Sequence, residues 1–223
     1  LPRRHYPVAP HQSLAALGSA EDHCWLVTSG LVARIGATED GSRQILGVHL
    51  PGELANLSAM CLAARPALEA VARSTVLAIP LSALRKLVAL RTGLGEALTR
   101  ECLLAAEILV EWLMNVGRRD ARSRTAYCFC ELALRYAEAE GALLDRFLLP
   151  MSQEQLADAL ALTPVHVNRT LKVLRQEGIV TFLRGMVTIH DWARLASVAG
   201  FNPAYLHLRP CDRSQPSSIR LSS

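Results

Sequence analysis

Short apolar runs separated by turn residues make up about the first 80 residues. In "HCWLVTSGLVARIGATEDGSRQILGVHLPGE" (23–53) the runs are interrupted at Ser29-Gly30, Asp40-Gly41 and Pro51-Gly52. Asp-Gly between two apolar runs is a hairpin signal, and short strands at this spacing are typical of a small β-barrel or roll. Residues 74–80, "STVLAIP", predict one further strand that ends at Pro80.

From about Gly95 to Gly117 the pattern becomes that of one long helix, about 33 Å in length at 1.5 Å per residue. It is apolar on nearly every side and must be covered on more than one face. Either it is the central helix of a monomeric core, or it packs on its own roll and on a second subunit. We favour the second arrangement, because some of its apolar residues alternate at spacings of four and three, as in a two-stranded coiled coil. This seam, the expected dimer interface, comprises Leu98, Cys102, Ala105, Leu109, Trp112 and Val116.

Two short helices with a tight turn between them are predicted further along the chain. Ser152 and Gln155 form a capping box, which starts the first helix. Thr163 is the N-cap of the second helix, and Pro164 occupies its first position, where a missing N–H costs nothing. Ala161 stands where glycine is common in such turns. Together these signals predict a helix-turn-helix.

The second of these helices turns polar residues outward while Val167, Leu171 and Leu174 face its core. "QEGIVTFLRGMVTIH" (176–190) follows at once and predicts two strands around Arg184-Gly185, a β-wing. Side chains near the N-terminus of such a helix meet base edges, arginine can pair bidentately with guanine, and lysine suits phosphates. The residues expected to contact DNA are Ser152, Thr163, Val165, His166, Asn168, Arg169, Lys172 and Arg184.

Charge and composition agree with a DNA-binding second half. The chain has 223 residues, 51% of them hydrophobic, enough for one large or two ordinary domains. Residues 1–117 carry 10 basic and 10 acidic residues, whereas residues 118–223 carry 14 and 10, so the net charge of +4 lies entirely in the second half. This asymmetry indicates a polyanion partner there.

These features resemble the bacterial cyclic-AMP receptor protein/Fnr (Crp/Fnr) family of transcription regulators. The resemblance spans nearly the whole chain: "WLVTSGLVAR…DGSRQILGVHLPGEL", the long helix, "GRRDARSRTA" and, most specifically, "LTPVHVNRTLKVLRQEGIV". It implies an α+β fold with an N-terminal cyclic-nucleotide-binding-like β-roll, a long dimerisation helix and a C-terminal winged helix-turn-helix. The expected boundaries are 1–91 for the β-roll sensor domain, 92–118 for the helix, 119–209 for the DNA-binding domain and 210–223 for a disordered tail.

For function, the resemblance implies a homodimer that binds a palindromic promoter in double-stranded DNA. We expect it to work in the cytoplasm with RNA polymerase as a further partner. The arginine of the family's reading helix matches Arg169. Its neighbouring base-reading positions are Pro164, Val165 and His166, which lack the family's glutamate and second arginine. The preferred half-site is therefore expected to differ from that of the cyclic-AMP receptor protein.

The family's nucleotide pocket is only partly matched. Gly52-Glu53-Leu54 keeps the first part of the phosphate cassette, in which the glutamate holds the ribose. The Arg-Ser-Ala part has become Arg65-Pro66-Ala67, and Pro66 offers a phosphate neither hydroxyl nor N–H. The adenine-contacting Thr-Ser positions fall at or near Leu109 and Val110, which are apolar.

Gly52, Glu53, Leu54 and Arg65 are the candidate effector-pocket residues, but cyclic AMP is not the expected effector. Glu53 has a simpler interpretation, the capping of a turn. The roll then either binds an unidentified small-molecule effector or is an empty scaffold in a constitutive regulator.

Other chemistry finds little support in the sequence. The seven histidines do not cluster with acids or cysteines at ligand spacing, and no Walker loop, nucleophile elbow or HExxH motif occurs. We expect no metal, no cofactor, no enzymatic activity and no membrane span. The six cysteines (24, 61, 102, 128, 130 and 211) form no framework, and most are flanked by apolar residues, which predicts buried reduced thiols. The N-terminal cysteine cluster that holds an iron–sulfur centre in Fnr-type members is not present, which disfavours oxygen sensing by that route. One alternative remains, a cyclic-nucleotide-type ligand-binding sensor module whose helix-turn-helix is only scaffold.

Overall fold

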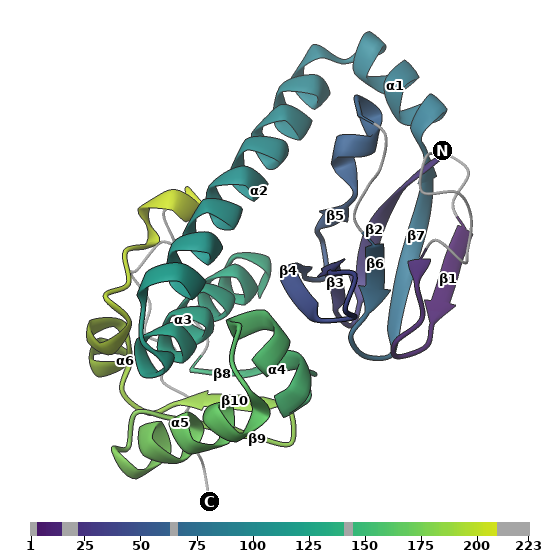
Figure 1. Ribbon diagram of the computed structural model, residues 1–223. Helices are drawn as coiled ribbons and strands as arrows, with labels where there is room; N and C mark the ends of the chain where they lie inside the picture. The colour runs from purple at the N-terminus through teal and green to yellow at the C-terminus, as the bar shows by residue number, and fades with distance from the viewer. Residues whose placement is uncertain (1–3, 15–21, 63–66, 141–144, 209–223) are drawn as a thin grey trace, which may run out of the picture.

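Two antiparallel sheets form the N-terminal roll of the computed structural model, which describes residues 4–14, 22–62, 67–140 and 145–208 (Figure 1). One sheet has the order β1 (Arg4–Val8), β7 (Ser74–Pro80), β2 (His23–Ser29), β5 (Leu54–Ala55). The other has the order β4 (Arg43–His49), β3 (Val32–Ala37), β6 (Ala67–Ala70). Arg65 and the predicted tail lie outside the described residues.

The hairpin predicted at Asp40-Gly41 is confirmed. β3 and β4 pair from Val32↔His49 to Ala37↔Arg43. The Asp40 carboxylate accepts a hydrogen bond from the Ser42 backbone N–H at 3.1 Å, and Gly41 has φ 84°, which glycine adopts without strain. The expected strand at 74–80 is β7, which pairs with both β1 and β2. Trp25 and Val27 of β2 point into the roll, as the period of two in a strand requires.

Helices connect the roll to the C-terminal unit. The short helix η2 (Leu57–Met60) lies beside the start of α2, α1 (Leu81–Leu90) follows β7, and α2 (Thr92–Arg118) is the long helix that was expected over 95–117. Asp120 then accepts a hydrogen bond from the Ser123 N–H at 2.8 Å and so caps α3 (Ala121–Glu140). Backbone hydrogen bonds from this turn keep the pKa of the Asp120 carboxyl below its usual value.

The C-terminal unit contains the predicted helix-turn-helix and wing. The unit begins with α3, and its further elements are β8 (Arg146–Leu148), α4 (Gln153–Leu160), α5 (Pro164–Gln176), β9 (Val180–Leu183), β10 (Met186–Ile189), α6 (Trp192–Ala199) and η3 (Pro203–Leu206). β8 was not anticipated as a strand. It pairs with β10 and adds a third strand to the wing, in the order β8-β10-β9.

One hydrophobic core joins the roll to the C-terminal unit. Ile45 and Val48 of β4 belong to the same buried cluster as Phe129 of α3 and Leu156 of α4. The sheet face that carries β4 therefore packs directly against the first helix of the helix-turn-helix (Figure 1).

The prediction that most cysteines are buried holds for three of the five that are described. Cys24, Cys128 and Cys130 are buried, whereas Cys61 and Cys102 are exposed. Burial raises the pKa of the Cys24 thiol to about 12, so this thiol stays protonated at neutral pH. Among the described residues, no helix is long and apolar enough to cross a membrane.

Candidate nucleic-acid interface and roll cavity

The first helix of the helix-turn-helix, α4, begins where the capping box predicts. Ser152 Oγ accepts a hydrogen bond from the Gln155 N–H at 3.1 Å, and Gln155 Oε1 accepts one from the Ser152 N–H at 2.8 Å. The Gln155 side-chain amide also donates to the carbonyl oxygen of Val71 in the roll at 3.0 Å. The side chain that caps α4 thus also attaches it to the roll.

A three-residue turn sets the direction of α5. Ala161 has φ 51° and ψ 47°, the left-handed conformation in which an alanine costs about 1 kcal/mol relative to glycine. The Leu162 N–H donates to the Ala157 carbonyl at 3.0 Å and closes the end of α4. Thr163 Oγ1 then accepts from the His166 N–H at 3.2 Å, and Pro164 takes the first helical position, as predicted.

The outward face of α5 carries polar and basic side chains that are free to meet a ligand. Val167, Leu171 and Leu174 are buried against α4 and the core, which leaves the opposite face in solvent. We call this opposite face the reading face; it comprises Val165, His166, Asn168, Arg169 and Lys172, all exposed. Within the described residues, Arg169 and Lys172 make no side-chain hydrogen bond or ion pair.

Asn168 is the member of the reading face that is already bound. Its Nδ2 donates to Gln153 Oε1 at 3.0 Å and links α5 to the start of α4 across the turn. Sequence reasoning missed Gln153, since an exposed glutamine in a first helical turn carries no distinctive signal. A base contact by Asn168 requires this link to break.

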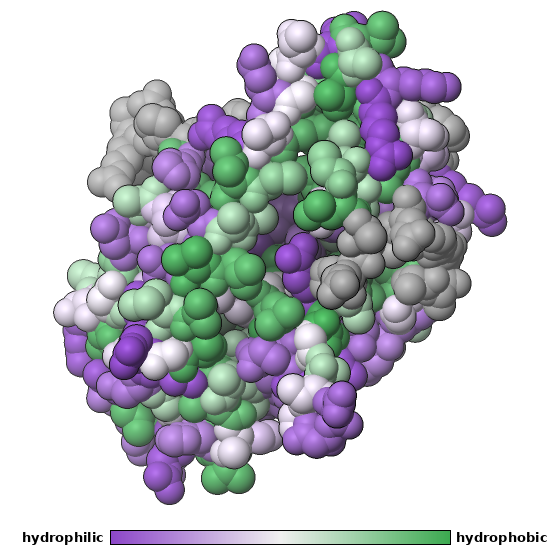
Figure 2. All heavy atoms as spheres, turned by 45° about the horizontal axis from the view of Figure 1, so that its top comes forward, coloured by the Kyte–Doolittle hydropathy of each residue, from purple (hydrophilic) through white to green (hydrophobic). Residues whose placement is uncertain are grey.

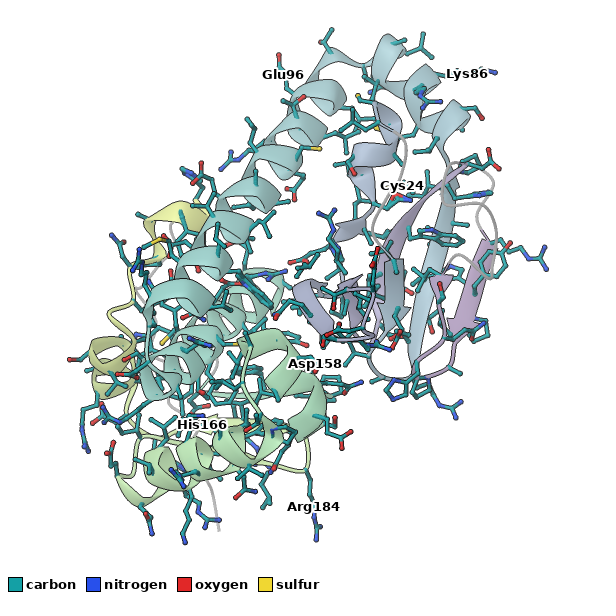
Figure 3. All side chains as sticks on the ribbon, in the orientation of Figure 1. Cys24, Lys86, Glu96, Asp158, His166 and Arg184 are labelled. Atoms are coloured by element: carbon teal, nitrogen blue, oxygen red, sulfur yellow. The ribbon has the colours of Figure 1, made fainter. Side chains whose placement is uncertain are left out.

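The wing places another cation at the same end of the molecule. Arg184 and Gly185 have φ 50° and 77°, the two positive values of a type I′ hairpin turn, which confirms the predicted strands around this pair. A Cβ on Gly185 would lie 3.3 Å from the Leu149 carbonyl oxygen, so a larger residue there would crowd the β8 segment. In Figure 3 the Arg184 side chain points away from the fold at the end where α5 lies.

The described structure corrects the predicted seam on α2 at two of its six residues, Leu98 and Trp112. Leu98 is buried with α1 and η2, and Trp112 is buried in the central core, so these two residues face their own chain and not a partner. Cys102, Ala105 and Leu109 line a cavity between α2 and the roll. Val116, the last seam residue, is half-buried. The spacing of three and four recurs in more than one register on a helix that is apolar all round, and the sequence does not tell which register faces the roll.

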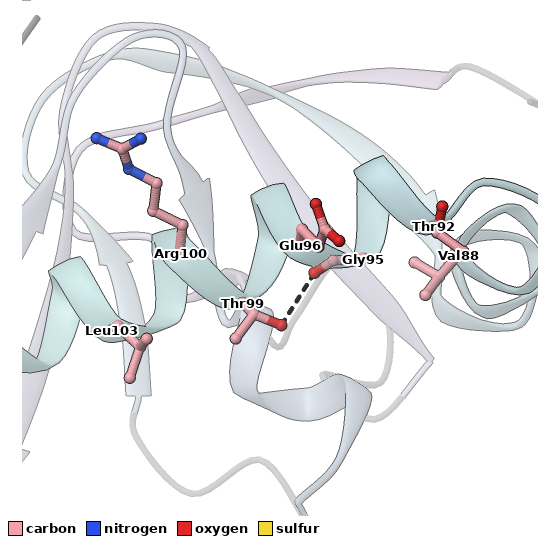
Figure 4. Close-up of a pocket in the computed structure, with 7 residues that line it drawn as sticks. All are labelled: Val88, Thr92, Gly95, Glu96, Thr99, Arg100 and Leu103. Atoms are coloured by element: carbon pink, nitrogen blue, oxygen red, sulfur yellow. Dashed lines mark hydrogen bonds between the residues drawn. The ribbon is translucent and has the colours of Figure 1, made fainter.

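A neighbouring register of α2 is the more exposed one, although Cys102, Ala105 and Leu109 of the predicted seam are also exposed, and Ala106 of the neighbouring register lines the same cavity. Its exposed apolar residues follow the same alternation of three and four, one position later than the predicted seam, and Figure 2 shows hydrophobic atoms gathered on the face that α2 crosses. We call these residues the α2 stripe; they are Leu103, Ala106, Val110, Leu113 and Gly117. At its N-terminal end the stripe meets a shallow groove of about 610 Å³ between α1 and α2, lined by Val88, Thr99 and Leu103 among others (Figure 4).

The cavity between the roll and α2 has a volume of about 280 Å³. Of the candidate pocket residues, Glu53 and Leu54 line it, Gly52 is not among its lining residues, and Arg65 lies outside the described residues. Its other polar groups include Arg34 and His49. Burial lowers the pKa of His49 to about 4, so this imidazole is neutral at physiological pH.

Sequence reasoning missed the most tightly bound residue of the cavity, Arg135 of α3. Its side chain is 8% exposed and pairs with Glu53 at 2.7 Å and with Glu131 at 3.0 Å. Glu131, four residues earlier on the same helix, also accepts hydrogen bonds from the indole of Trp112 and the hydroxyl of Tyr205. In the sequence, Glu131 and Arg135 have the spacing of an ordinary solvent-exposed helix pair, which hides their role.

A winged helix-turn-helix whose second helix exposes Arg169 and Lys172, both unpaired among the described residues, has the form of a DNA-binding unit, and here it is joined to a β-roll. The chain is therefore built as a DNA-binding regulator. Comparison with known proteins leads to the same class. A family model described as "Crp-like helix-turn-helix domain" matches residues 123–198, and one described as "Cyclic nucleotide-binding domain" matches residues 6–91.

The chain belongs to the Crp/Fnr family of transcription regulators. It is 28% identical to the "Transcriptional activator protein FnrA" of Stutzerimonas stutzeri over 201 residues, which are 89% of this chain and 81% of that protein. It is 26% identical to the "Fumarate and nitrate reduction regulatory protein" of Salmonella typhimurium, over 88% of this chain and 79% of that protein. Its fold matches the structure of FixK2 from Bradyrhizobium japonicum with a TM-score of 0.77 at 23% identity, over 91% of this chain and 100% of that one.

Family membership decides between the two functional classes that the sequence left open. The chain is a DNA-binding transcription regulator and not an enzyme. The alternative was a sensor module whose helix-turn-helix is only scaffold. It does not agree with the comparison, because the chain matches transcriptional activators over 81% and 77% of their own length.

Proposed function

We propose that the protein binds a palindromic operator as a homodimer, with the reading face of α5 in the major groove of each half-site. The observation that carries this proposal is the pair of exposed cations Arg169 and Lys172, which have no partner within the described residues. The second helix of a helix-turn-helix fits into the major groove, and two subunits about a twofold axis match half-sites about 34–36 Å apart. The protein acts where chromosomal DNA lies, in the cytoplasm, and RNA polymerase is the proposed partner at the promoter.

Within the reading face, Arg169 and Lys172 have different roles. Arg169 lies nearer the start of α5, where side chains reach base edges, and its guanidinium matches the O6 and N7 acceptors of guanine. Lys172 lies about one turn later and suits a phosphate, which positions the helix but carries no sequence information. Thr163 at the N-cap of α5 is a further proposed phosphate contact, because a helix N-terminus favours anions. The cationic side chain of Arg184 on the wing is another.

Binding of fluorescent duplexes that differ at single base pairs tests this assignment. Arg169→Ala should cost about 1–3 kcal/mol and relax the preference at one base pair. Lys172→Ala should weaken all duplexes alike and reduce the slope of log affinity against log salt by about 1. If Arg169→Ala left both affinity and sequence preference unchanged, the proposed docking would be wrong.

We propose that the homodimer forms through the α2 stripe. Three apolar residues of this stripe, Leu103, Val110 and Leu113, are more than half exposed in the single chain. Exposure of a continuous apolar row to water is unfavourable in free energy, and the spacing of the row is that of a two-stranded coiled coil. The stripe replaces the predicted seam, whose residues Leu98 and Trp112 are already buried.

We also propose that cyclic AMP is not the effector. Glu53, the residue that would hold the ribose, has its carboxylate engaged by Arg135 and by the backbone N–H of Leu50 at 3.0 Å. The second bond supports the expectation that Glu53 caps a turn. Leu109 supplies an apolar wall to the cavity where the family's adenine contacts are polar. A nucleotide in this cavity would leave its own polar groups unpaired.

Calorimetric titration of the protein with cyclic AMP and cyclic GMP tests this second proposal. We expect no heat of binding and no change in operator affinity. Micromolar binding that also tightens operator affinity would overturn it, and Arg65→Ala would then show whether that arginine holds the phosphate.

A further inference from the structure

Arg135 fills the polar end of the roll cavity with contacts that a bound ligand would otherwise make. Its Nη2 donates to Glu53 Oε2 at 2.7 Å and Oε1 at 3.0 Å, and its Nε donates to Glu53 Oε1 at 3.2 Å. The same Nη2 donates to the Val48 carbonyl oxygen at 2.7 Å, and Nη1 donates to Glu131 Oε1 at 3.0 Å. A planar guanidinium with donors on every side is the group that this set of acceptors fits.

The contacts of Arg135 cross the boundary between the two halves of the chain. Glu53 and Val48 belong to the roll, whereas Arg135 and Glu131 belong to α3, the first helix of the C-terminal unit. Glu53 and Arg135 are 82 residues apart in the sequence, so their ion pair links the roll to α3 through the tertiary fold. Burial disfavours the charged guanidinium, but the attraction of Glu53 and Glu131 outweighs it, and the pKa of Arg135 is raised.

Two amide side chains tie α4 to the roll near the same junction. Gln44 of β4 donates to the Asp158 carbonyl oxygen of α4 at 2.6 Å, and Gln155 donates to the Val71 carbonyl oxygen at 3.0 Å. α3 and α4 are therefore both bound to the roll, and the direction of the reading face follows from how they are held.

We propose that the polar end of the cavity is a guanidinium-binding site whose ligand is the chain's own Arg135. We infer that this internal ligand orients the DNA-binding unit on the roll and takes the place of a small effector. The inference rests on the proposed function and extends it to regulation. It follows that any molecule that binds Glu53 must first displace a buried, multiply bonded side chain, and that operator binding needs no added ligand.

Chemical rescue tests the proposal directly. Arg135→Ala removes the guanidinium and leaves room for a small one. Its operator affinity should fall by about tenfold, within the usual range of coupling between sites, and millimolar ethylguanidinium should restore it. Ethylammonium at the same concentration has the same charge and ionic strength but lacks the planar fork, so it should not restore affinity. Wild-type protein should respond to neither.

Two further variants show whether the rescue occurs at this site. Arg135→Ala/Glu53→Gln lacks the carboxylate that would hold ethylguanidinium and should not be rescued. Arg85→Ala is the matched control: Arg85 of α1 also donates to backbone carbonyls, of Ala59 and Met60, but lies away from the junction. It should keep operator affinity and ignore ethylguanidinium.

Thermal unfolding separates failure of this proposal from failure of the proposed function. Ethylguanidinium should raise the Tm of Arg135→Ala and not that of the double variant, whether or not the protein binds DNA. Absence of any Tm response, or equal rescue by ethylammonium, would overturn the internal-ligand proposal. If Arg135→Ala does not fold, Arg135→Lys serves instead. Wild-type operator affinity in Arg135→Lys would refute the need for a guanidinium.

Discussion

Replacing Leu113 by aspartate is expected to break the proposed homodimer. Leu113 lies in the α2 stripe with 68% of its surface exposed, and it belongs to none of the buried clusters of the described chain. The substitution should therefore leave the fold of the single chain intact. In the dimer, the same side chain would lie against its symmetry mate, and an aspartate there would be buried without a partner.

The magnitude follows from the exposed fraction. Full burial of a leucine contributes about 1.5–3 kcal/mol, so covering the exposed part of Leu113 contributes about 1–2 kcal/mol per subunit. A twofold axis applies this gain twice, which gives about 2–4 kcal/mol for the pair. The dissociation constant of the dimer should therefore rise by about 30- to 900-fold, and the buried charge moves the result toward the upper end.

Analytical ultracentrifugation at micromolar concentration measures this change. The matched control is Leu183→Asp, which places the same charge at a leucine of similar exposure (62%) on the wing, away from α2. We expect wild-type protein and Leu183→Asp to sediment as dimers, and Leu113→Asp as a monomer that binds a full palindrome no more tightly than one half-site. A dimer of unchanged stability in Leu113→Asp would refute the assignment of the stripe, and a wild-type monomer would refute the homodimer itself.

Three further outcomes are expected in urea unfolding experiments. Ser152→Ala, which removes the N-cap of α4, should cost about 1 kcal/mol, and Ser152→Asp, which can still cap, should cost much less. Leu156→Ala, at a fully buried position, should cost about 2–5 kcal/mol, and a loss below that range would mean that the shared core repacks there. His49 has a folded-state pKa of about 4 against 6.5 in the unfolded chain, so its contribution is complete above pH 6.5 and is lost as pH falls toward 4. The free energy of unfolding should decrease over that window by at most about 1.4 kcal/mol per pH unit, and His49→Gln should decrease less; equal slopes would contradict the burial of a neutral imidazole.

Local signals in the sequence were enough to place the helix-turn-helix and its wing. The capping box at Ser152, the N-cap at Thr163 followed by proline, and the Arg184-Gly185 turn each act over three or four residues. Their hydrogen bonds form within one turn of the chain, so the residue types alone specify the geometry. The direction of Arg169 toward solvent follows in turn from the helical period, which buries Val167 and Leu171 on the other side.

Contacts between distant segments required the folded structure. Leu98 and Trp112 share the apolar spacing of the α2 stripe, and their burial is decided by packing against other elements: η2 and α1 cover Leu98, and α3 and the central core cover Trp112. Glu53 and Arg135 are 82 residues apart, so no local pattern relates them. Helical period and capping depend only on residues within a few positions of one another. The covered face of α2 and the occupant of the roll cavity depend instead on which surfaces come into contact in the tertiary fold.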